Sequence, residues 1–541
     1  MFRIRLLPVA MTAVLAACAQ APQKPEPAKA AAVAPASQHV NPFLTASTLP
    51  FQAPPFDKIT DADYQPAIEE GMRQQLADVG RIANDPSPPT FENTYVALEK
   101  TGTLLYRVMA VFNGVSGANT DDTLQKLQET EAPKMAAHQD AIYLNGKLFA
   151  RIDTVYNERA KLKLDPESLR LVEVVHANFV RAGAKLSAAN KGKLEALNKE
   201  ESSLSAGFVN KLLAAAKAGA LVVDDKAKLA GMSAADIAAA AQDAKARGLD
   251  GKWVVPLQNT TQQPALQDLS DRATRQALFE ASWNRAEHGD ANDTRATIER
   301  LAQLRAEKTK LLGFPNFAAW SLQDQMAKNP ATVFAFMHKL APAAVARARV
   351  EAHDIQAMID KDQKALGKPS FKLEPWDWEH YAEQVRKAKY DLDESQIKPY
   401  FELNNVLENG VFYAAHQLYG LNFKERHDIP VYQPDVRVFD VFDKDGSQLG
   451  LFYCDYFKRD NKAADEAKQI QAMIDKSGPH FDLKPWDWEM YSEKVRKAKY
   501  DLDQNEVKQY LQLEKLREGI FWVAGQLYGF QFTPVNDVPV Y

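Results

Sequence analysis

Cysteine is almost absent from this sequence, since only Cys18 and Cys454 occur among its 541 residues. So few cysteines exclude the disulfide framework that holds many small secreted domains together. Cys454 follows the apolar residues Leu451-Phe452-Tyr453. We therefore predict that Cys454 is buried and packs as a small hydrophobic side chain, not as a reactive thiol.

A basic excess is missing as well. The 66 lysines and arginines are outnumbered by 71 aspartates and glutamates, which gives a formal net charge of −5. Nucleic-acid-binding proteins normally carry a basic excess, so this balance argues against a nucleic-acid partner. The sequence also lacks a phosphate-binding loop, a G-x-G-x-x-G motif and a G-x-S-x-G nucleophile elbow; the nearest approach to the last is Gly114-Val115-Ser116-Gly117.

Long hydrophobic runs are missing too, and the apolar run Leu6–Ala17 is too short to span a membrane as a helix. It follows Arg3 and Arg5 and leads through small residues into Cys18, which is typical of a secretory signal. The string Leu15-Ala16-Ala17-Cys18 resembles the bacterial lipobox. This resemblance implies cleavage before Cys18 and lipid attached to Cys18. The alternative is an ordinary cleaved signal with an incidental cysteine.

We predict that residues 1–18 form this lipoprotein signal and that residues 19–40 form a disordered tether. The tether is rich in Ala, Pro, Gln and Lys, so it has little apolar surface to bury. Ala19 is not the aspartate that marks inner-membrane retention in enteric bacteria. We therefore expect a periplasm-facing protein that two or three acyl chains anchor at the outer membrane.

Helical periodicity is the main pattern that is present. From Thr60 to about Val345 apolar residues recur at helical spacing, and Thr60 and Thr90 are placed to cap two of the helices. The clearest β signal is Val436–Phe457, where two β-rich runs flank a turn at Asp443-Lys444-Asp445-Gly446. This turn lacks the other ligands of a calcium loop, so it predicts a hairpin. The fold class is therefore mainly α with a small β hairpin.

One segment of the chain occurs twice. Pro375–Asp393 and Pro485–Asp503 are identical at 16 of 19 positions, and the likeness extends from about Glu351–Tyr432 to about Glu466–Tyr541. Two copies are too few for a solenoid, so the pattern indicates a partial duplication. In each copy we predict a helix from the P-W-D-W string onward, with the tryptophans packed in a core. A second helix is predicted over Tyr400–Tyr419, closed by a glycine C-cap at the next residue.

Ten further strings follow one another along the chain, and together they cover about Asn41–Lys462. They are Asn41-Pro42-Phe43, Pro54-Pro55-Phe56-Asp57, Pro66-Ala67-Ile68, Phe91-Glu92-Asn93-Thr94, Leu312-Gly313-Phe314, Phe371–Asp393, Val436-Arg437-Val438-Phe439, Leu451-Phe452-Tyr453, Asp455-Tyr456 and Arg459-Asp460. In this order they resemble the peptidyl-dipeptidase Dcp and thimet oligopeptidase family of zinc metallopeptidases. The resemblance implies a two-lobed helical body with a deep channel between the lobes. It also implies a zinc cofactor and a protease activity on short peptides, with dipeptides released from the C-terminus in the peptidyl-dipeptidase branch.

The motif that carries this family's chemistry is missing. In H-E-x-x-H, two histidines one helical turn apart bind zinc, and the glutamate acts as general base on the zinc-bound water. None of the ten histidines here is followed by glutamate or lies four residues from another histidine. The likeness stops at Lys462, and the second copy begins at Ala463. We therefore predict no catalytic residue, no metal ligand and no bound zinc in this chain, which is truncated before the metal motif.

Other histidines do not replace the missing ligands by their spacing. His380, His416 and His427 of the first copy align with Met490, Gly525 and Asn536 of the second copy. Three ligands must converge on one zinc ion, and nothing in the sequence places these three together.

The predicted domains are an N-terminal helical lobe (residues 41–345), the start of a catalytic lobe with the first copy and the hairpin (346–462), and a partial second copy (463–541). We expect the second copy to be poorly settled, because the first copy already occupies its packing site. Enzyme activity stays open: the chain descends from zinc oligopeptidases but lacks their metal site. The alternatives are a catalytically empty product of a rearranged gene and a non-catalytic periplasmic lipoprotein that binds peptides. The expected partners are short peptides. We also expect contact with the membrane, but only through the lipid anchor.

Overall fold

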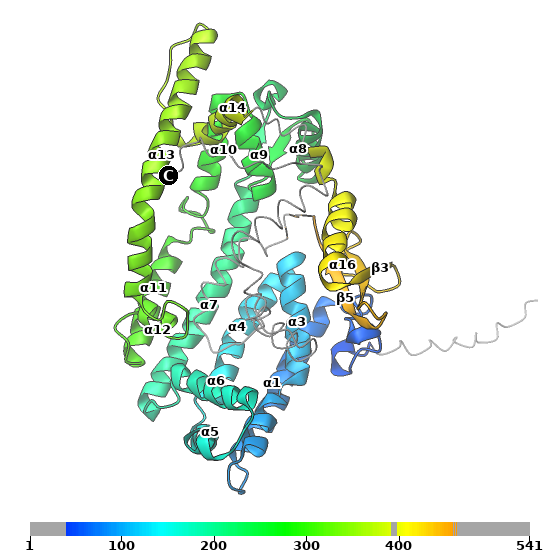
Figure 1. The fold of residues 1–541 in the computed structure, drawn as a ribbon, viewed down its shortest axis with the longest axis vertical. Helices are drawn as coiled ribbons and strands as arrows, with labels where there is room; N and C mark the ends of the chain where they lie inside the picture. Colours follow the sequence, from blue (N-terminus) through cyan, green and yellow to red (C-terminus); the bar gives the residue numbers. More distant parts are fainter. Residues whose placement is uncertain (1–38, 391–397, 458, 460, 462–541) are drawn as a thin grey trace, which may run out of the picture. The chain divides into compact units, whose positions relative to one another are not determined.

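The computed structural model describes residues 39–390, 398–457, 459 and 461 (Figure 1). The chain divides into two compact units, Met1–Asn41 and Pro42–Tyr541, and the helices and strands described below belong to the second unit. Cys18, the predicted tether up to residue 38 and the whole second repeat copy from Ala463 lie outside the described residues. The predictions made for them, including a poorly settled second copy, therefore stay predictions, as do the domain boundaries.

The described chain is mainly α, as the sequence predicts. The α-helices up to residue 218 are α1 (Asp61–Ala83), α2 (Ala97–Glu99), α3 (Thr103–Ala118), α4 (Asp122–Tyr143), α5 (Gly146–Glu158), α6 (Pro166–Ala182) and α7 (Ala188–Ala218). Thr60 and Thr90 each begin a helical segment with a reciprocal capping box, Thr60 with Asp63 and Thr90 with Asn93. Both predicted caps are thus confirmed.

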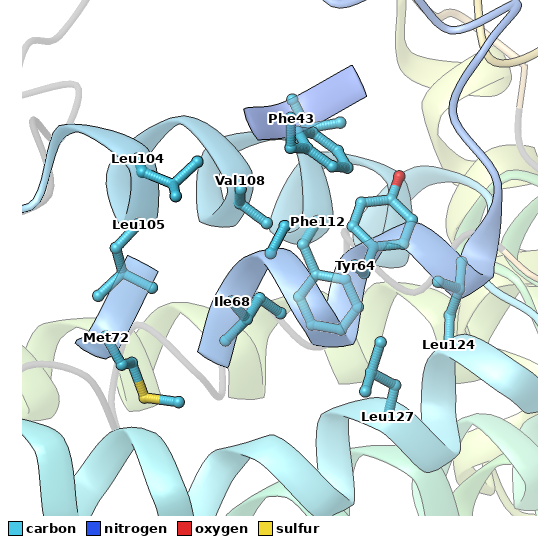
Figure 2. Close-up of a cluster of buried hydrophobic side chains, with 12 residues drawn as sticks. Phe43, Tyr64, Ile68, Met72, Leu104, Leu105, Val108, Phe112, Leu124 and Leu127 are labelled. Carbon is cyan, nitrogen blue, oxygen red and sulfur yellow. The ribbon is translucent and has the colours of Figure 1, made fainter. Parts of the chain in front are cut away.

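A buried cluster joins α1, α3 and α4, as Figure 2 shows. Tyr64 and Ile68 of α1 face Phe112 of α3 within it. Gly71 permits this close packing of α1 on α3, because a Cβ at Gly71 would lie only 2.8 Å from the backbone of Leu105. A larger residue at this position would therefore force the two helices apart.

The middle of the chain adds six helices and a small two-stranded sheet. The helices are α8 (Ala234–Ala246), α9 (Asn259–Asp268), α10 (Arg272–Trp283), α11 (Arg295–Leu311), α12 (Phe317–Leu322) and α13 (Pro330–Ala365). Strand β1 (Leu221–Val223) pairs antiparallel with strand β2 (Trp253–Val255). The buried side chains of this sheet and of α9 and α10 form one core. The boundary proposed at residues 345/346 lies inside α13.

The last described part contains α14 (Trp378–Tyr390), α16 (Tyr413–Tyr419) and a three-stranded antiparallel sheet of β3 (Asn422–Arg426), β4 (Arg437–Phe442) and β5 (Gln448–Cys454). The β4–β5 hairpin and its turn are confirmed, and β3 extends the sheet beyond the prediction. Cys454 is 3% exposed in a cluster with Phe439, and burial raises the pKa of its thiol. Both observations agree with the predicted buried side chain.

Short 3-10 and π segments connect these elements. The 3-10 turns are η1 (Pro42–Leu44), η2 (Pro50–Gln52), η4 (Arg159–Lys161), η5 (Lys226–Leu229), η6 (Pro375–Asp377) and η7 (Lys398–Phe401), and the π segments are η3 (Phe91–Val96) and η8 (Asn405–Phe412). The segment predicted as one helix over Tyr400–Tyr419 instead contains the end of η7, the π segment η8 and α16, so that prediction is only partly right. Gly420 closes α16 with φ 74°, as predicted. Among the described residues, no helix is long and apolar enough to span a bilayer.

Candidate functional site

The repeated P-W-D-W string carries a buried carboxylate, Asp377, which is 0% exposed. Two arginines of α10 hold it. Arg272 donates from Nε to Oδ1 at 3.0 Å and from Nη2 to Oδ2 at 2.8 Å, and Arg275 donates from Nη2 to Oδ1 at 3.3 Å. Arg275 is 1% exposed and also donates from Nη1 to the Leu269 carbonyl at 2.7 Å. A buried charge is tolerated only when it is paired in this way.

Aromatic rings and a histidine complete the attachment of the first copy. The Arg272 guanidinium lies 4.0 Å from the ring centre of Phe371, and the ring of Trp376 meets Phe279 edge-on at 6.3 Å. His380 donates from Nδ1 to the Gln267 carbonyl at 2.8 Å. Burial, and then the charge of Arg275, lower the pKa of His380, so this imidazole is neutral at pH 7.

We call the surface that receives the first copy the α9–α10 face, defined by Gln267, Arg272, Arg275 and Phe279. These four residues supply every contact described in the two preceding paragraphs. The face rests on the core that α9 and α10 share with β1 and β2, and the residues of that core all precede the repeat in the sequence.

The first copy also has a core of its own, between α13 and α14. Ile355, Ile359 and Tyr381 are buried in it, and Trp378 packs against them. The predicted core role is thus confirmed for Trp378, whereas Trp376 is half-buried against Phe279 and Arg272. Their counterparts in the second copy lie outside the described residues.

A second polar cluster lies where β5 ends. Arg459 pairs with Asp455, with Nη2 3.0 Å from Oδ1, and with Asp435, and it donates from Nη1 to the Ala118 carbonyl at 3.2 Å. Tyr432 donates its hydroxyl to Asp455 at 2.8 Å, and burial followed by the Asp455 carboxylate raises the Tyr432 pKa. The segment that follows β5 is therefore fixed by one guanidinium that bridges two carboxylates.

The same cluster attaches the chain to the connection between α3 and α4. The Thr120 amide donates to the Asn461 carbonyl at 3.0 Å, and Asn461 and Gln433 both donate to the side-chain oxygen of Asn119 at 2.9 Å. This attachment is the last described point before the second copy. Sequence reasoning quoted Arg459 only as part of a family string and missed its partners. The Ala118 carbonyl lies 341 residues away, and nothing in the sequence pairs Arg459 with Asp455 or Asp435.

A third polar cluster, also missed from the sequence, lies among α4, α7 and α11. Asn198 donates from Nδ2 to Asp140 Oδ1 at 2.7 Å, and Glu201 accepts from Arg305 at 3.0 Å and from Lys308 at 3.2 Å. Burial raises the pKa of Asp140 to about 6. Helical periodicity does not reveal such groups, because they occupy positions that a pattern search assigns to apolar side chains.

The three histidines considered as replacement ligands do not converge. His380 uses Nδ1 for the Gln267 carbonyl and its Nε2 faces the Gln384 amide at 3.0 Å, while His416 and His427 are exposed. Across residues 39–390, 398–457, 459 and 461, no group of three histidine, cysteine, aspartate or glutamate side chains is arranged to hold a metal ion. The described residues do not fit a zinc ion, so we derive no chemical step through one.

Comparison with known proteins agrees with the resemblance in the sequence. Residues 265–465 and 461–541 each match the family model of Peptidase family M3, so the second match begins where the second copy does. The chain is 55% identical over 424 residues to "Dipeptidyl carboxypeptidase" of Escherichia coli K12, which covers 78% of this chain and 62% of that protein. It is 51% identical over 423 residues to the Salmonella typhimurium protein of the same name, with the same coverage.

"Oligopeptidase A" of Escherichia coli is more distant, at 28% identity over 429 residues, or 78% of this chain and 61% of that protein. The chain thus spans about 61–62% of the length of these relatives. The family match covers both repeat copies and the α9–α10 face that receives the first. On this evidence the chain belongs to Peptidase family M3.

Proposed function

We propose that this chain is a dipeptidyl-carboxypeptidase-like M3 protein that keeps the family's scaffold for short peptides but does not itself hydrolyse them. The identity of 55% to the Escherichia coli dipeptidyl carboxypeptidase supports descent from enzymes that release dipeptides. The buried ion pair at Asp377 and the Arg459 cluster support an intact scaffold up to Asn461. The substrate class and the activity are those named for the relatives, and for this chain they are part of the proposal.

One observation carries the inactive half of the proposal. A zinc peptidase needs a cation that lowers the pKa of a bound water, and two imidazoles one helical turn apart normally hold it. In these 541 residues no histidine is followed by glutamate or lies four residues from another. Without that site nothing generates a hydroxide at neutral pH, and we propose that the chain binds no catalytic zinc.

The test is an assay of the purified chain with equimolar zinc and an N-blocked tripeptide, with dipeptide release followed by mass spectrometry. The Escherichia coli dipeptidyl carboxypeptidase serves as positive control. We expect release at the level of the protein-free blank and well under one zinc per chain by elemental analysis. Dipeptide release that a chelator abolishes, together with stoichiometric zinc, would overturn the proposal.

A second candidate function is peptide binding without hydrolysis. It is favoured by the order and extent of the family likeness, which runs over 78% of the chain. Fluorescence anisotropy with a labelled pentapeptide distinguishes the two readings. A micromolar dissociation constant supports a peptide-binding protein, whereas no saturable binding supports a catalytically empty product of gene rearrangement.

We also propose that lipid on Cys18 anchors the protein, facing the periplasm at the outer membrane. Arg3, Arg5 and the apolar run before Leu15-Ala16-Ala17-Cys18 support a lipoprotein signal. Metabolic labelling with an alkyne fatty acid is expected to mark the wild-type chain and not Cys18→Ser. Equal labelling of both would contradict lipid attachment at this residue.

A further inference from the structure

The duplicated segment provides two versions of the group that docks on the α9–α10 face. In the first copy the docking side chains are Phe371, Trp376 and Asp377. The second copy has the same residue types at the matching positions, namely Phe481, Trp486 and Asp487. One docking residue differs, because His380 is replaced by Met490. The second copy therefore retains the carboxylate and the rings but lacks the donor to the Gln267 carbonyl.

The second copy also retains the residues of the local core. In the first copy this core consists of Ile355, Ile359, Phe371, Leu373, Trp378, Tyr381 and Val385, together with Met358 and Ala382. The matching positions of the second copy are Ile470, Ile474, Phe481, Leu483, Trp488, Tyr491 and Val495, with Met473 and Ser492. Eight of these nine positions are identical. The second sequence thus keeps the apolar residues of this core, although the stretch from Ile474 to Phe481 is five residues shorter than the matching stretch from Ile359 to Phe371.

The receiving face, in contrast, exists once. The duplication begins near Glu351, whereas α9 and α10 span Asn259–Trp283 and have no second version in the sequence. Asp377 is fully buried when Arg272 and Arg275 hold it, so the two arginines accommodate one carboxylate of this kind at a time. Two docking segments in one chain therefore compete for one pair of arginines, of which Arg275 is buried and Arg272 half-buried.

We propose that the α9–α10 face is a docking site for either repeat copy, and that residues 466–503 of the same molecule occupy it when the first copy is weakened. The first copy holds the face in the native chain because His380 adds a hydrogen bond to Gln267 that Met490 does not supply. Losing the buried Asp377 carboxylate leaves Arg275 without its partner, which is strongly unfavourable. Asp487 relieves that cost by restoring the ion pair.

The experiment places the photocrosslinker p-benzoylphenylalanine at Phe279, which contacts Trp376 in the first copy. After irradiation and trypsin digestion, mass spectrometry identifies which repeat was captured, because the two P-W-D-W peptides differ in mass. We expect capture of the first copy in the wild-type background. In Asp377→Asn we expect the ratio of second-copy to first-copy capture to rise by more than about tenfold. In Asp377→Asn/Asp487→Asn we expect this rise to disappear.

The docking residues of the two copies differ only at His380 and Met490. Exchanging the residue at either position gives a mild variant that keeps the buried ion pair. His380→Met removes the advantage of the first copy, and Met490→His gives the same donor to the second copy. Both are expected to shift capture towards the second copy, while Asp487→Asn alone leaves the wild-type pattern unchanged. Circular dichroism checks that each variant is folded.

Capture of the first copy alone in all of these variants would show that the second copy does not fit the face. An equal mixture of isotopically labelled and unlabelled protein separates capture within one molecule from capture between molecules. Crosslinks found only between molecules would overturn the proposed exchange within one chain.

Discussion

Asn198 of α7 donates a hydrogen bond of 2.7 Å to Asp140 of α4, and Asp140 is buried while Asn198 is half-buried. The bond stabilises the carboxylate, but burial outweighs it and raises the pKa of Asp140 to about 6 from an ordinary value of 3.8. The folded protein thus binds a proton at Asp140 in a pH range where the unfolded chain has already released it. This difference links proton binding to stability.

Asp140→Asn is expected to remove a pH-dependent penalty. As the pH rises from about 4 to about 6, the unfolded state loses its proton first, so the wild-type free energy of unfolding falls through this window. Above pH 6 the penalty is complete, at up to about 3 kcal/mol for a shift of this size. Urea unfolding at pH 4.5 and pH 7 should therefore show that the gain in stability of Asp140→Asn over wild type is larger at pH 7 than at pH 4.5, where only part of the penalty has developed.

The matched control for this prediction is Asp250→Asn, which changes an exposed carboxylate. We expect its difference from wild type to be the same at both pH values. A pH-independent effect of Asp140→Asn would contradict the raised pKa.

Arg275→Met is expected to destabilise the fold by about 3 kcal/mol or more. Arg275 is fully buried, and its loss leaves Asp377 with Arg272 alone and the Leu269 carbonyl without this donor. In the exchange proposed above, the second copy uses the same arginine, so we expect no compensation from it. The measurement is the free energy of unfolding in urea at pH 7.

Arg170→Met provides the comparison for Arg275→Met, since the ion pair of Arg170 with Glu173 is exposed. Exposed pairs contribute about 0–1 kcal/mol, so this variant should unfold almost as the wild type does. Equal losses in the two variants would argue that burial of the Asp377 pair is unimportant.

Local chemistry was predictable from the sequence, whereas long-range contacts were not. The caps at Thr60 and Thr90 and the left-handed Gly420 depend on residues within a few positions, and the structure has all three. The β4–β5 hairpin likewise follows from two β-rich runs beside a turn. Propensity and capping act within one turn, which is why these features can be read directly.

The pairing of Arg275 with Asp377 joins residues 102 positions apart, and that of Gln433 with Asn119 joins residues 314 positions apart. No periodicity relates such positions, and a single sequence gives no other signal for them. The P-W-D-W string was singled out because it is repeated, yet the role of its aspartate became visible only with α10 beside it.

Gly71→Ala is expected to destabilise the contact of α1 with α3 by about 1–3 kcal/mol, the usual cost of overpacking. Its added Cβ would meet the Leu105 backbone at 2.8 Å, and a backbone atom cannot rotate away. Gly80→Ala in the same helix is the control, because nothing lies within 4 Å of its Cβ position. That change should stabilise the helix by about 0.5–1 kcal/mol through backbone entropy, so thermal unfolding should shift in opposite directions for the two variants.

Arg459→Gln is expected to loosen the attachment of the segment after β5. Arg459 bridges Asp455 and Asp435 and donates to the Ala118 carbonyl, so its loss leaves two carboxylates close together without a cation. We expect a cost of about 1.5–3 kcal/mol, as for hydrogen bonds to charged groups. Hydrogen exchange at the Thr120 amide, which donates to Asn461, should become faster, while exchange in α1 stays unchanged.

Faster exchange in both regions would mean global destabilisation and contradict a local role. Arg295→Gln, which removes an exposed pair with Asp293, should leave both rates at the wild-type values.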